Sequence, residues 1–273
     1  HYSSTENDIT TSFADLLYKI HESTPDLPRL RFLTSYPRDF TEEALDVMAS
    51  CERICNYLHI PVQSGSDSVL KKMNRGYTKD IYMKLIHQAR SKMPDISIVG
   101  DMIVGFPNES EDDFLMSLDL LREVKYKNIF VFKYSPRPGT VAGKRDADPI
   151  SQKEKKERNA RMLAVQHEIS LAHHQKMLGK TFDVLVEGIA KINPSQKAQS
   201  NGPGDAGGLL QIGGGPKSVT PSVVLSNNNV RLTARTRGDH IVAFDGPENL
   251  IGQIVSVKIE DAASLSLKGH LTP

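Results

Sequence analysis

The chain has 273 residues, of which 38% are hydrophobic and 25% charged, a composition typical of globular proteins. Its 34 basic and 33 acidic residues give a formal net charge of +1, which excludes an overall field that attracts nucleic acid. No apolar run reaches the roughly 18 residues that a membrane helix needs, and no signal peptide is recognisable. The two cysteines, Cys51 and Cys55, are too few for a disulfide framework and suit a reducing cytoplasm. We therefore expect a cytoplasmic protein with one large domain and one small domain.

From residue 10 to about 150, helical and strand patterns alternate along the chain. Helical periodicity begins at Phe13, Thr41, Thr78 and Ser110, and the pair Ser110 and Asp113 has the spacing of a capping box. Short apolar runs that predict strands lie between the helices, at residues 30–37, 57–66, 96–107 and 128–136. Strands that alternate with helices indicate β-α units. The pattern therefore predicts an α/β fold whose parallel sheet has four strands in this region.

A long helix follows, and the chain then changes character. Ser151 and Glu154 have the spacing of a capping box that opens this helix, and Gly179 stands where the helix should end. Beyond it, "TFDVLVEGIAK", "VRLTART", "HIVAFDG" and "IGQIVSVKIED" are short alternating strands, as in a small antiparallel β-barrel. A glycine-rich stretch at about 191–222 predicts a flexible insertion. A boundary near residue 177 would divide the chain into domains of residues 1–177 and 178–273.

Each predicted strand of the first domain runs into a polar loop shaped by glycine or proline: "SYPRD", "QSGSD", "GFPNES" and "YSPRPGT". Ligands of parallel α/β sheets bind at the carboxyl ends of the strands, so these loops predict a binding site along one edge. The loop that begins at Gln63 would offer hydroxyls and backbone amides to a ribose or carboxylate, although Ser-Gly-Ser is also ordinary turn chemistry. Arg75 and Arg137 could each bind a phosphate or carboxylate, or be solvated surface groups.

Other polar residues are interpreted in the same way, with a functional and a structural alternative. Asp101 would be costly in a buried strand unless it is paired, so we expect it to point into a polar mouth rather than to be neutralised structurally. Cys51 and Cys55 lack the third thiol of a metal site and are interpreted as buried free thiols. His173 and His174 point about 100° apart on a helix, so we expect them to be solvated. We also expect the basic residues of the long helix to be solvated, because acidic residues lie between them. They are Lys153, Lys155, Lys156, Arg158 and Arg161.

Three stretches carry a resemblance to a known family. "LHIPVQSGSDSVLKKMNRGYT", "VGDMIVGFPNESEDDF" and "FVFKYSPRPGTVA" resemble the radical S-adenosylmethionine (SAM) methylthiotransferases, most of all the MiaB type. Residues 178–273 resemble a TRAM domain, with "VLVEG" near the start and "SLKGHL" near the end. The combination of "QSGS" with "MNRGY" favours the MiaB type over the types that modify threonylcarbamoyl-adenosine in tRNA or a ribosomal protein. In fold, the resemblance implies the last four strands of a partial (β/α) barrel followed by the TRAM barrel.

In function, the resemblance implies methylthiolation at C2 of N(6)-isopentenyladenosine beside the tRNA anticodon. The enzyme would use SAM and two [4Fe-4S] clusters, and its TRAM domain would hold the anticodon stem-loop. By the resemblance, the SAM pocket would be lined by Gln63, Ser64, Gly65, Ser66, Asp101, Gly105, Glu109 and Tyr134. Substrate and RNA contacts would come from Arg75, Arg137, and from Arg231, Arg235 and Arg237, whose alternating positions would place them on one strand face.

The chain also departs from the family pattern. The Cys-x-x-x-Cys-x-x-Cys motif of the SAM-cleaving cluster is absent, so we expect an N-terminal part of the same protein to supply it and assign no metal ligand or catalytic residue here. We expect this fragment alone to be inactive and the protein to be a monomer. Two other classes of function stay open: a non-catalytic RNA-binding module, and an ordinary barrel enzyme that acts on a phosphorylated metabolite.

Overall fold

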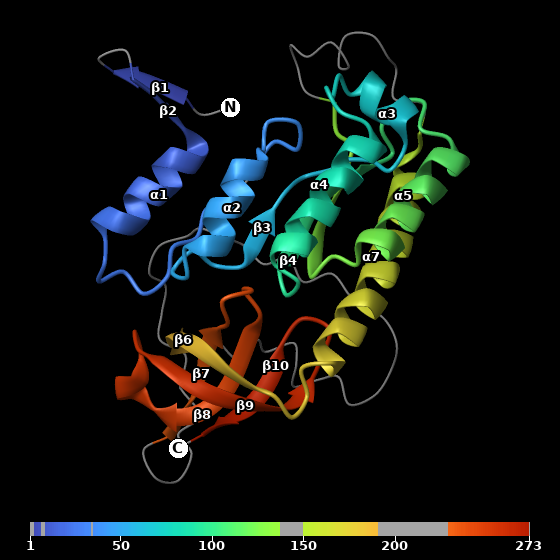
Figure 1. Cartoon of the computed structure of the whole chain (residues 1–273). Coiled ribbons are helices and arrows are strands. Elements are labelled where there is room, and N and C mark those ends of the chain that lie inside the picture. Colours follow the sequence, from blue (N-terminus) through green and yellow to red (C-terminus); the bar gives the residue numbers. More distant parts are fainter. Residues whose placement is uncertain (1–2, 7–8, 34, 137–149, 191–228, 273) are drawn as a thin grey trace, which may run out of the picture.

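The structure is a computed structural model, which describes residues 3–6, 9–33, 35–136, 150–190 and 229–272. A three-stranded parallel sheet carries helices on one face, and a small closed β-barrel lies beneath it (Figure 1). The long helix α7 (Gln152–Gln175) runs from one unit to the other, and a hairpin of β1 (Ser3–Glu6) and β2 (Ile9–Ser12) precedes the first helix. No helix among the described residues is long and apolar enough to cross a membrane.

The sheet is built from β-α units, as the alternating pattern predicts. Its strands are β3 (Tyr57–His59), β4 (Ser97–Val104) and β5 (Asn128–Lys133), which are parallel and adjacent in that order. The central strand β4 is buried on both faces until Asp101, as expected when helices cover a parallel sheet. Helices packed with the sheet and with one another are α1 (Phe13–Ser23), α2 (Glu42–Ser50), α4 (Lys79–Lys92), α5 (Glu111–Val124) and α7, while the short α3 (Asp67–Lys72) follows β3.

The helix starts follow local sequence signals. Thr41 and Thr78 cap α2 and α4, and Ser110 forms the predicted reciprocal box with Asp113 at the start of α5. Ser151 caps α7 by accepting a hydrogen bond from the backbone of Glu154, but the predicted box is wrong in its second half. The Glu154 carboxylate binds Arg158 one turn further along the helix instead.

The described residues of the segment 30–37 do not form the predicted strand, so the sheet that the structure describes has three strands rather than four. Leu30 forms an isolated parallel bridge with Ile54, and the Ser35 N–H donates to the carbonyl of His59. The segment therefore runs beside β3 without a continuous ladder. Between these contacts the side chain of Phe32 packs in an aromatic cluster, with its ring centroid 5.2 Å from that of Phe13.

The second unit is a closed barrel of five strands in the order β10-β8-β7-β6-β9. The strands are β6 (Thr181–Ile189), β7 (Asn229–Arg235), β8 (Ile241–Pro247), β9 (Ile254–Ala262) and β10 (Leu267–Leu271). All pairs are antiparallel except β10 with β8, so the barrel is mixed rather than wholly antiparallel. Strict alternation of buried and outward residues in β7 fills the core with Val230, Leu232 and Ala234. The predicted insertion at 191–222 lies outside the described residues.

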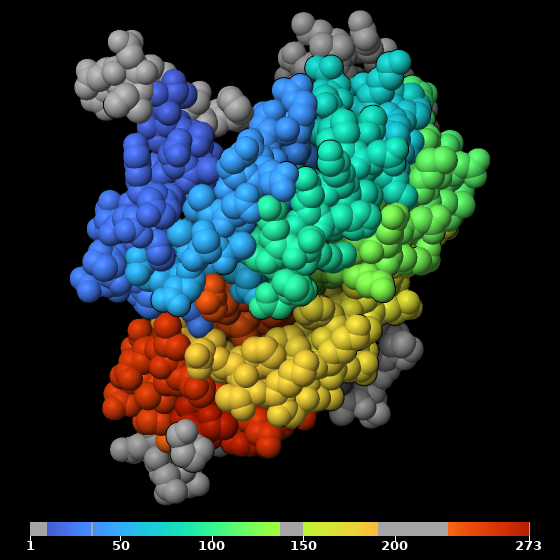
Figure 2. Space-filling model, viewed as in Figure 1, coloured from blue at the N-terminus to red at the C-terminus, as the bar shows by residue number. Residues whose placement is uncertain are grey.

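The barrel packs against the amino-terminal edge of the sheet. The turn of residues 236–240 reaches up beneath the strands, and Figure 2 shows orange atoms of the barrel between the blue and green parts of the sheet unit. Met177 lies in the turn after α7 and belongs to the core of the barrel. We therefore keep the domain boundary near residue 177 as a proposal.

Candidate functional site

The face of the sheet opposite the helices is where side chains remain accessible. The register aligns Asp101 with Phe130 and Ile103 with Phe132, and neighbours in a parallel pair share one face. Phe130 is 39% exposed and Phe132 53% exposed, whereas the other face is packed under helices. We call His59, Asp101, Ile103, Phe130 and Phe132 the open sheet face.

Asp101 has a partner that sequence reasoning missed. Its Oδ1 lies 3.0 Å from His59 Nε2, and the His59 ring meets the ring of Phe130 edge-on at 6.1 Å. The Asp101 side chain is 22% exposed. Asp101 is therefore paired within the protein and also lies on an accessible face, and its contact with a ligand stays a prediction. The register could have predicted the pair, since His59 aligns with Val99 and Asp101 comes two residues later on the same face.

The loop after β3 contains the four residues Gln63 to Ser66. Gln63 bonds to β4, whereas Ser64, Gly65 and Ser66 pack against α5. Gln63 adopts a positive φ of 74°, which is uncommon for a residue other than glycine. Its N–H donates to the carbonyl of Asp101, and its carbonyl accepts from the N–H of Ile103, both in β4. Ser64 and Ser66 are buried, and the Ser66 hydroxyl donates to Asp113 at 2.5 Å. An added Cβ on Gly65 would lie 2.4 Å from a backbone carbonyl of α5. These three residues shape the loop, and their contact with a ligand stays a prediction.

The loop after β4 is held by a buried ion pair. Glu109 is 4% exposed, and its Oε2 accepts hydrogen bonds from the Gly105 N–H and from Arg158, both at 2.7 Å. Burial raises the pKa of the Glu109 carboxyl, while the Gly105 N–H and Arg158 oppose that shift. Gly105 has a φ of 72°, and a Cβ there would meet the side chain of Lys155 at 2.4 Å. Glu109 and Gly105 therefore stabilise the loop, and their contact with SAM stays a prediction.

The prediction that the basic residues of α7 are solvated is wrong for two of them. Lys155 is fully buried and Arg158 is 3% exposed. The Lys155 ammonium donates to the carbonyl of Tyr134 at 3.1 Å and lies 5.2 Å from the centre of the Tyr134 ring. The Tyr134 ring also packs against Phe106, with centroids 5.1 Å apart. Tyr134 thus lies at the end of β5 as predicted, fixed from two sides, while Arg137 lies outside the described residues.

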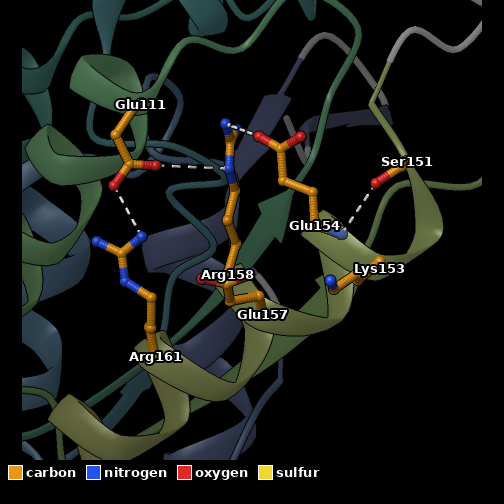
Figure 3. Close-up of a pocket in the computed structure, with 7 residues that line it drawn as sticks. All are labelled: Glu111, Ser151, Lys153, Glu154, Glu157, Arg158 and Arg161. Carbon is orange, nitrogen blue, oxygen red and sulfur yellow. Dashed lines mark hydrogen bonds and ion pairs between the residues drawn. The ribbon is translucent and has the colours of Figure 1, made fainter.

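A charged hollow of about 390 Å³ lies between the starts of α5 and α7. Figure 3 shows Arg158 between the carboxylates of Glu111 and Glu154, and Arg161 bound to Glu111 at 2.7 Å. The remaining lining residues are Ser151, Lys153 and Glu157. The described residues that line it are all polar or charged, and their three carboxylates balance their three cations, so we interpret the hollow as an ion-pair network rather than a ligand site.

The three arginines predicted to bind RNA are engaged within the protein. Arg231 pairs with Asp245 at 2.5 Å, and Arg235 pairs with both Glu187 and Asp239. Arg237 lies beyond the end of β7 and donates to a backbone carbonyl of the sheet unit at 2.9 Å. The predicted common strand face therefore holds for Arg231 and Arg235 but not for Arg237.

Asp239 is the electrostatic centre of the junction between the two units. It accepts from Arg31 at 2.7 Å and from Arg235 at 2.9 Å through one oxygen, and from Lys127 at 3.1 Å through the other. Burial by itself would raise the pKa of this carboxyl, but Lys127, Arg235 and Arg31 together lower it. The junction thus joins the segment before β3, the start of β5 and the barrel at one carboxylate.

Three histidines, His173, His174 and His240, contact one another at the same junction, and we call them the histidine cluster. The prediction that His173 and His174 are solvated is therefore wrong. His174 Nδ1 contacts the carbonyl of Ala263 at 2.6 Å, and His174 Nε2 lies 3.0 Å from His240 Nδ1. His240 Nε2 lies 3.2 Å from the hydroxyl of Ser97, and the His173 ring stacks on His240. Burial lowers the pKa of His173 to about 4 and that of His240 to about 2. The cluster is therefore neutral near pH 7, and its hydrogen bonds link α7, β4 and the barrel.

Each of the two units has a sequence that matches a known protein family. Residues 2–121 match the radical SAM superfamily, and residues 224–272 match the TRAM domain. The chain therefore belongs to the radical SAM superfamily and carries a TRAM domain, which confirms the family inferred from the three sequence stretches.

The relatives identify a more particular type. The tRNA-2-methylthio-N(6)-dimethylallyladenosine synthase of Thermoanaerobacter sp. (strain X514) is 38% identical over 97% of this chain and 48% of that protein. The synthase of the same name from Desulfitobacterium hafniense (strain Y51) is 39% identical over 94% of this chain and 49% of that protein. Coproporphyrinogen III oxidase (HemN) from Escherichia coli, a radical SAM enzyme, has a TM-score of 0.49 at 19% identity and covers 61% of this chain and 39% of that chain. The chain spans about half the length of the curated relatives it matches.

Radical SAM proteins use SAM and iron–sulfur clusters, and the described residues do not fit a cluster. They contain no group of three or more His, Cys, Asp or Glu side chains placed to bind a metal. Cys51 and Cys55 are free and buried, as predicted, and the Cys55 sulfur faces Arg31. The chemistry of a cluster is therefore not assigned to any described residue.

Proposed function

We propose that this chain is part of a radical SAM enzyme that methylthiolates C2 of N(6)-isopentenyladenosine beside the anticodon of tRNA. The observation that carries the proposal is the 38% identity, over 97% of the chain, to a synthase named for that product. The same match argues against the alternatives, namely threonylcarbamoyl-adenosine tRNA, a ribosomal protein, a non-catalytic RNA-binding module and a metabolite-converting barrel. A tRNA substrate implies a cytoplasmic protein, and we propose that it acts as a monomer.

The described residues suit the SAM side of this proposal better than the cluster side. We propose that SAM lies over the carboxyl ends of β3 to β5, where the amide of Gln63, the carboxylate of Asp101 and the ring of Tyr134 could bind and orient it. His59 would hold Asp101 in place, because the two side chains are hydrogen-bonded. When bound, SAM would supply the radical and the methyl group. We also propose that two [4Fe-4S] clusters are held by residues outside the described part of the protein.

The experiment that tests the proposal is nucleoside mass spectrometry of tRNA. Cells that lack the gene should lose 2-methylthio-N(6)-isopentenyladenosine and accumulate N(6)-isopentenyladenosine. The full-length gene should restore the modified nucleoside. If the 2-methylthio nucleosides are unchanged in the deletion strain, the proposed activity is wrong. If only a threonylcarbamoyl-adenosine derivative changes, the enzyme class is right but the substrate is wrong.

A further inference from the structure

Four cations gather at the carboxyl end of β3, and three of them have no carboxylate partner among the described residues. They are Arg38, Lys71, Lys72 and Arg75, which we call the basic rim. Among the described residues only Arg38 has a carboxylate partner, Asp39, and the Arg38 side chain remains 58% exposed. Arg75 has a buried Nε without a hydrogen-bond partner. The basic rim is thus a local excess of positive charge on a chain whose net charge is close to zero.

Two tyrosines fix the backbone that carries these cations. The Tyr77 hydroxyl donates to the carbonyl of Val62 at 3.1 Å, which ties the loop of residues 73–78 to the end of β3. The Tyr36 hydroxyl accepts from the Gly76 N–H at 2.9 Å, and the two tyrosine rings meet edge-on at 5.4 Å. The loops of residues 35–39 and 73–78 therefore form one rigid support.

Two side chains of the basic rim, those of Arg38 and Lys72, are held in defined directions as well. The Arg38 guanidinium lies 5.6 Å from the centre of the Tyr36 ring, a cation–π arrangement that limits its freedom. The Lys72 ammonium donates to the carbonyl of Asn108 at 2.9 Å, which links the basic rim to the loop after β4. The rim thus lies at the carboxyl end of β3 and reaches the loop after β4, at the same end of the sheet. Positive groups fixed in this way bind phosphates with little loss of side-chain entropy.

We propose that the basic rim binds the phosphates of a single-stranded RNA segment whose target base lies over the open sheet face. This inference rests on the proposed function, because it concerns RNA at the same site. The barrel arginines are poorer candidates, since Arg231 and Arg235 pair with carboxylates and Arg237 binds a backbone carbonyl. A phosphate would have to displace each of those contacts, whereas Lys71 and Arg75 have no carboxylate partner among the described residues and the Arg38 side chain stays 58% exposed.

The test measures RNA affinity separately from chemistry. The full-length protein that contains this chain is titrated with anticodon stem-loop RNA at several KCl concentrations, without added SAM. The double variant Arg38→Gln with Arg75→Gln should bind roughly 10- to 100-fold more weakly, and its salt slope should fall by about 1.4, since each lost phosphate contact removes about 0.7 for a single strand. The double variant Arg38→Lys with Arg75→Lys keeps both charges and should retain the salt slope. Arg231→Gln is the matched control in the barrel and should leave the slope unchanged.

Each outcome separates this inference from the proposed function. If the Gln double variant melts like the wild-type protein and binds RNA with the wild-type affinity and slope, the basic rim is not the contact surface, and the proposed function stands. If Arg231→Gln lowers the slope and the rim variant does not, the barrel is the contact surface instead. If the wild-type protein does not bind the RNA at all, both proposals are wrong.

Discussion

Replacing Asp239 by Asn should weaken the junction between the barrel and the sheet unit. Asn keeps the size of the side chain and tolerates the positive φ of 65° at this position, so the change removes charge without straining the backbone. It leaves Arg31, Arg235 and Lys127 facing an uncharged amide. Loss of one partner from a buried ion pair costs about 3–5 kcal/mol. The side chains here are 15% exposed for Asp239 and 26% for Arg31, and solvent screens part of that cost.

We therefore expect Asp239→Asn to lower the free energy of unfolding by about 2–3 kcal/mol and the melting temperature by roughly 4–12 °C. Thermal and urea unfolding of the purified protein would measure both values. Asp261→Asn is the control, because the Asp261 carboxylate accepts a hydrogen bond only from the adjacent Ala262 N–H. That control should stay within about 0.5 kcal/mol of the wild-type protein. Equal melting temperatures for Asp239→Asn and the wild-type protein would refute the role of this carboxylate in the junction.

Three further predictions follow from the buried polar groups and the close packing. The histidine cluster stays neutral when folded but takes up protons when unfolded, so stability should be constant above about pH 7 and fall between about pH 6.5 and 4. Urea titrations should show this slope reduced in His240→Gln but not in His167→Gln, which changes an exposed histidine on α7, the helix that carries His173 and His174; equal slopes would contradict the assignment. Glu109→Gln removes the only buried carboxylate partner that Arg158 has among the described residues and leaves it the more exposed carboxylates of Glu154 and Glu111, so it should cost about 2–3 kcal/mol in chemical denaturation, and a loss below about 1 kcal/mol would show that the pair is dispensable. Gly65→Ala should cost about 1–3 kcal/mol because its Cβ overlaps the Met116 carbonyl, so an unchanged unfolding midpoint would disprove the close contact.

Much of the fold was predictable because its signals are local. Thr41, Thr78 and Ser110 begin helices through hydrogen bonds that span only three residues. The alternation in β7 places every second side chain in the barrel core, and the β-α order specifies a parallel sheet. The family resemblance was likewise carried by continuous stretches of sequence.

The surroundings of the polar residues were not predictable in the same way. Lys155 and Arg158 lie in a run of charges that has the pattern of a solvated helix, yet they are buried because α7 packs along β5 and over the loop after β4. His174 and His240 are 66 residues apart and meet only because the barrel folds back under the sheet. Pairing of this kind depends on where two separate elements come together, and no periodicity within either element reports it.

The sequence by itself thus determined the α/β class, the helix starts, four of the five described barrel strands and the family, because each depends on neighbours within a few turns or on a continuous motif; the strand β10 was missed. Only the tertiary structure decided that Asp101 pairs with His59, that the barrel arginines are engaged, and that the basic rim gathers cations at the carboxyl end of β3. The physical reason is that burial and charge pairing are properties of contacts between distant segments. The cost of a buried charge then depends on the partner that the fold provides.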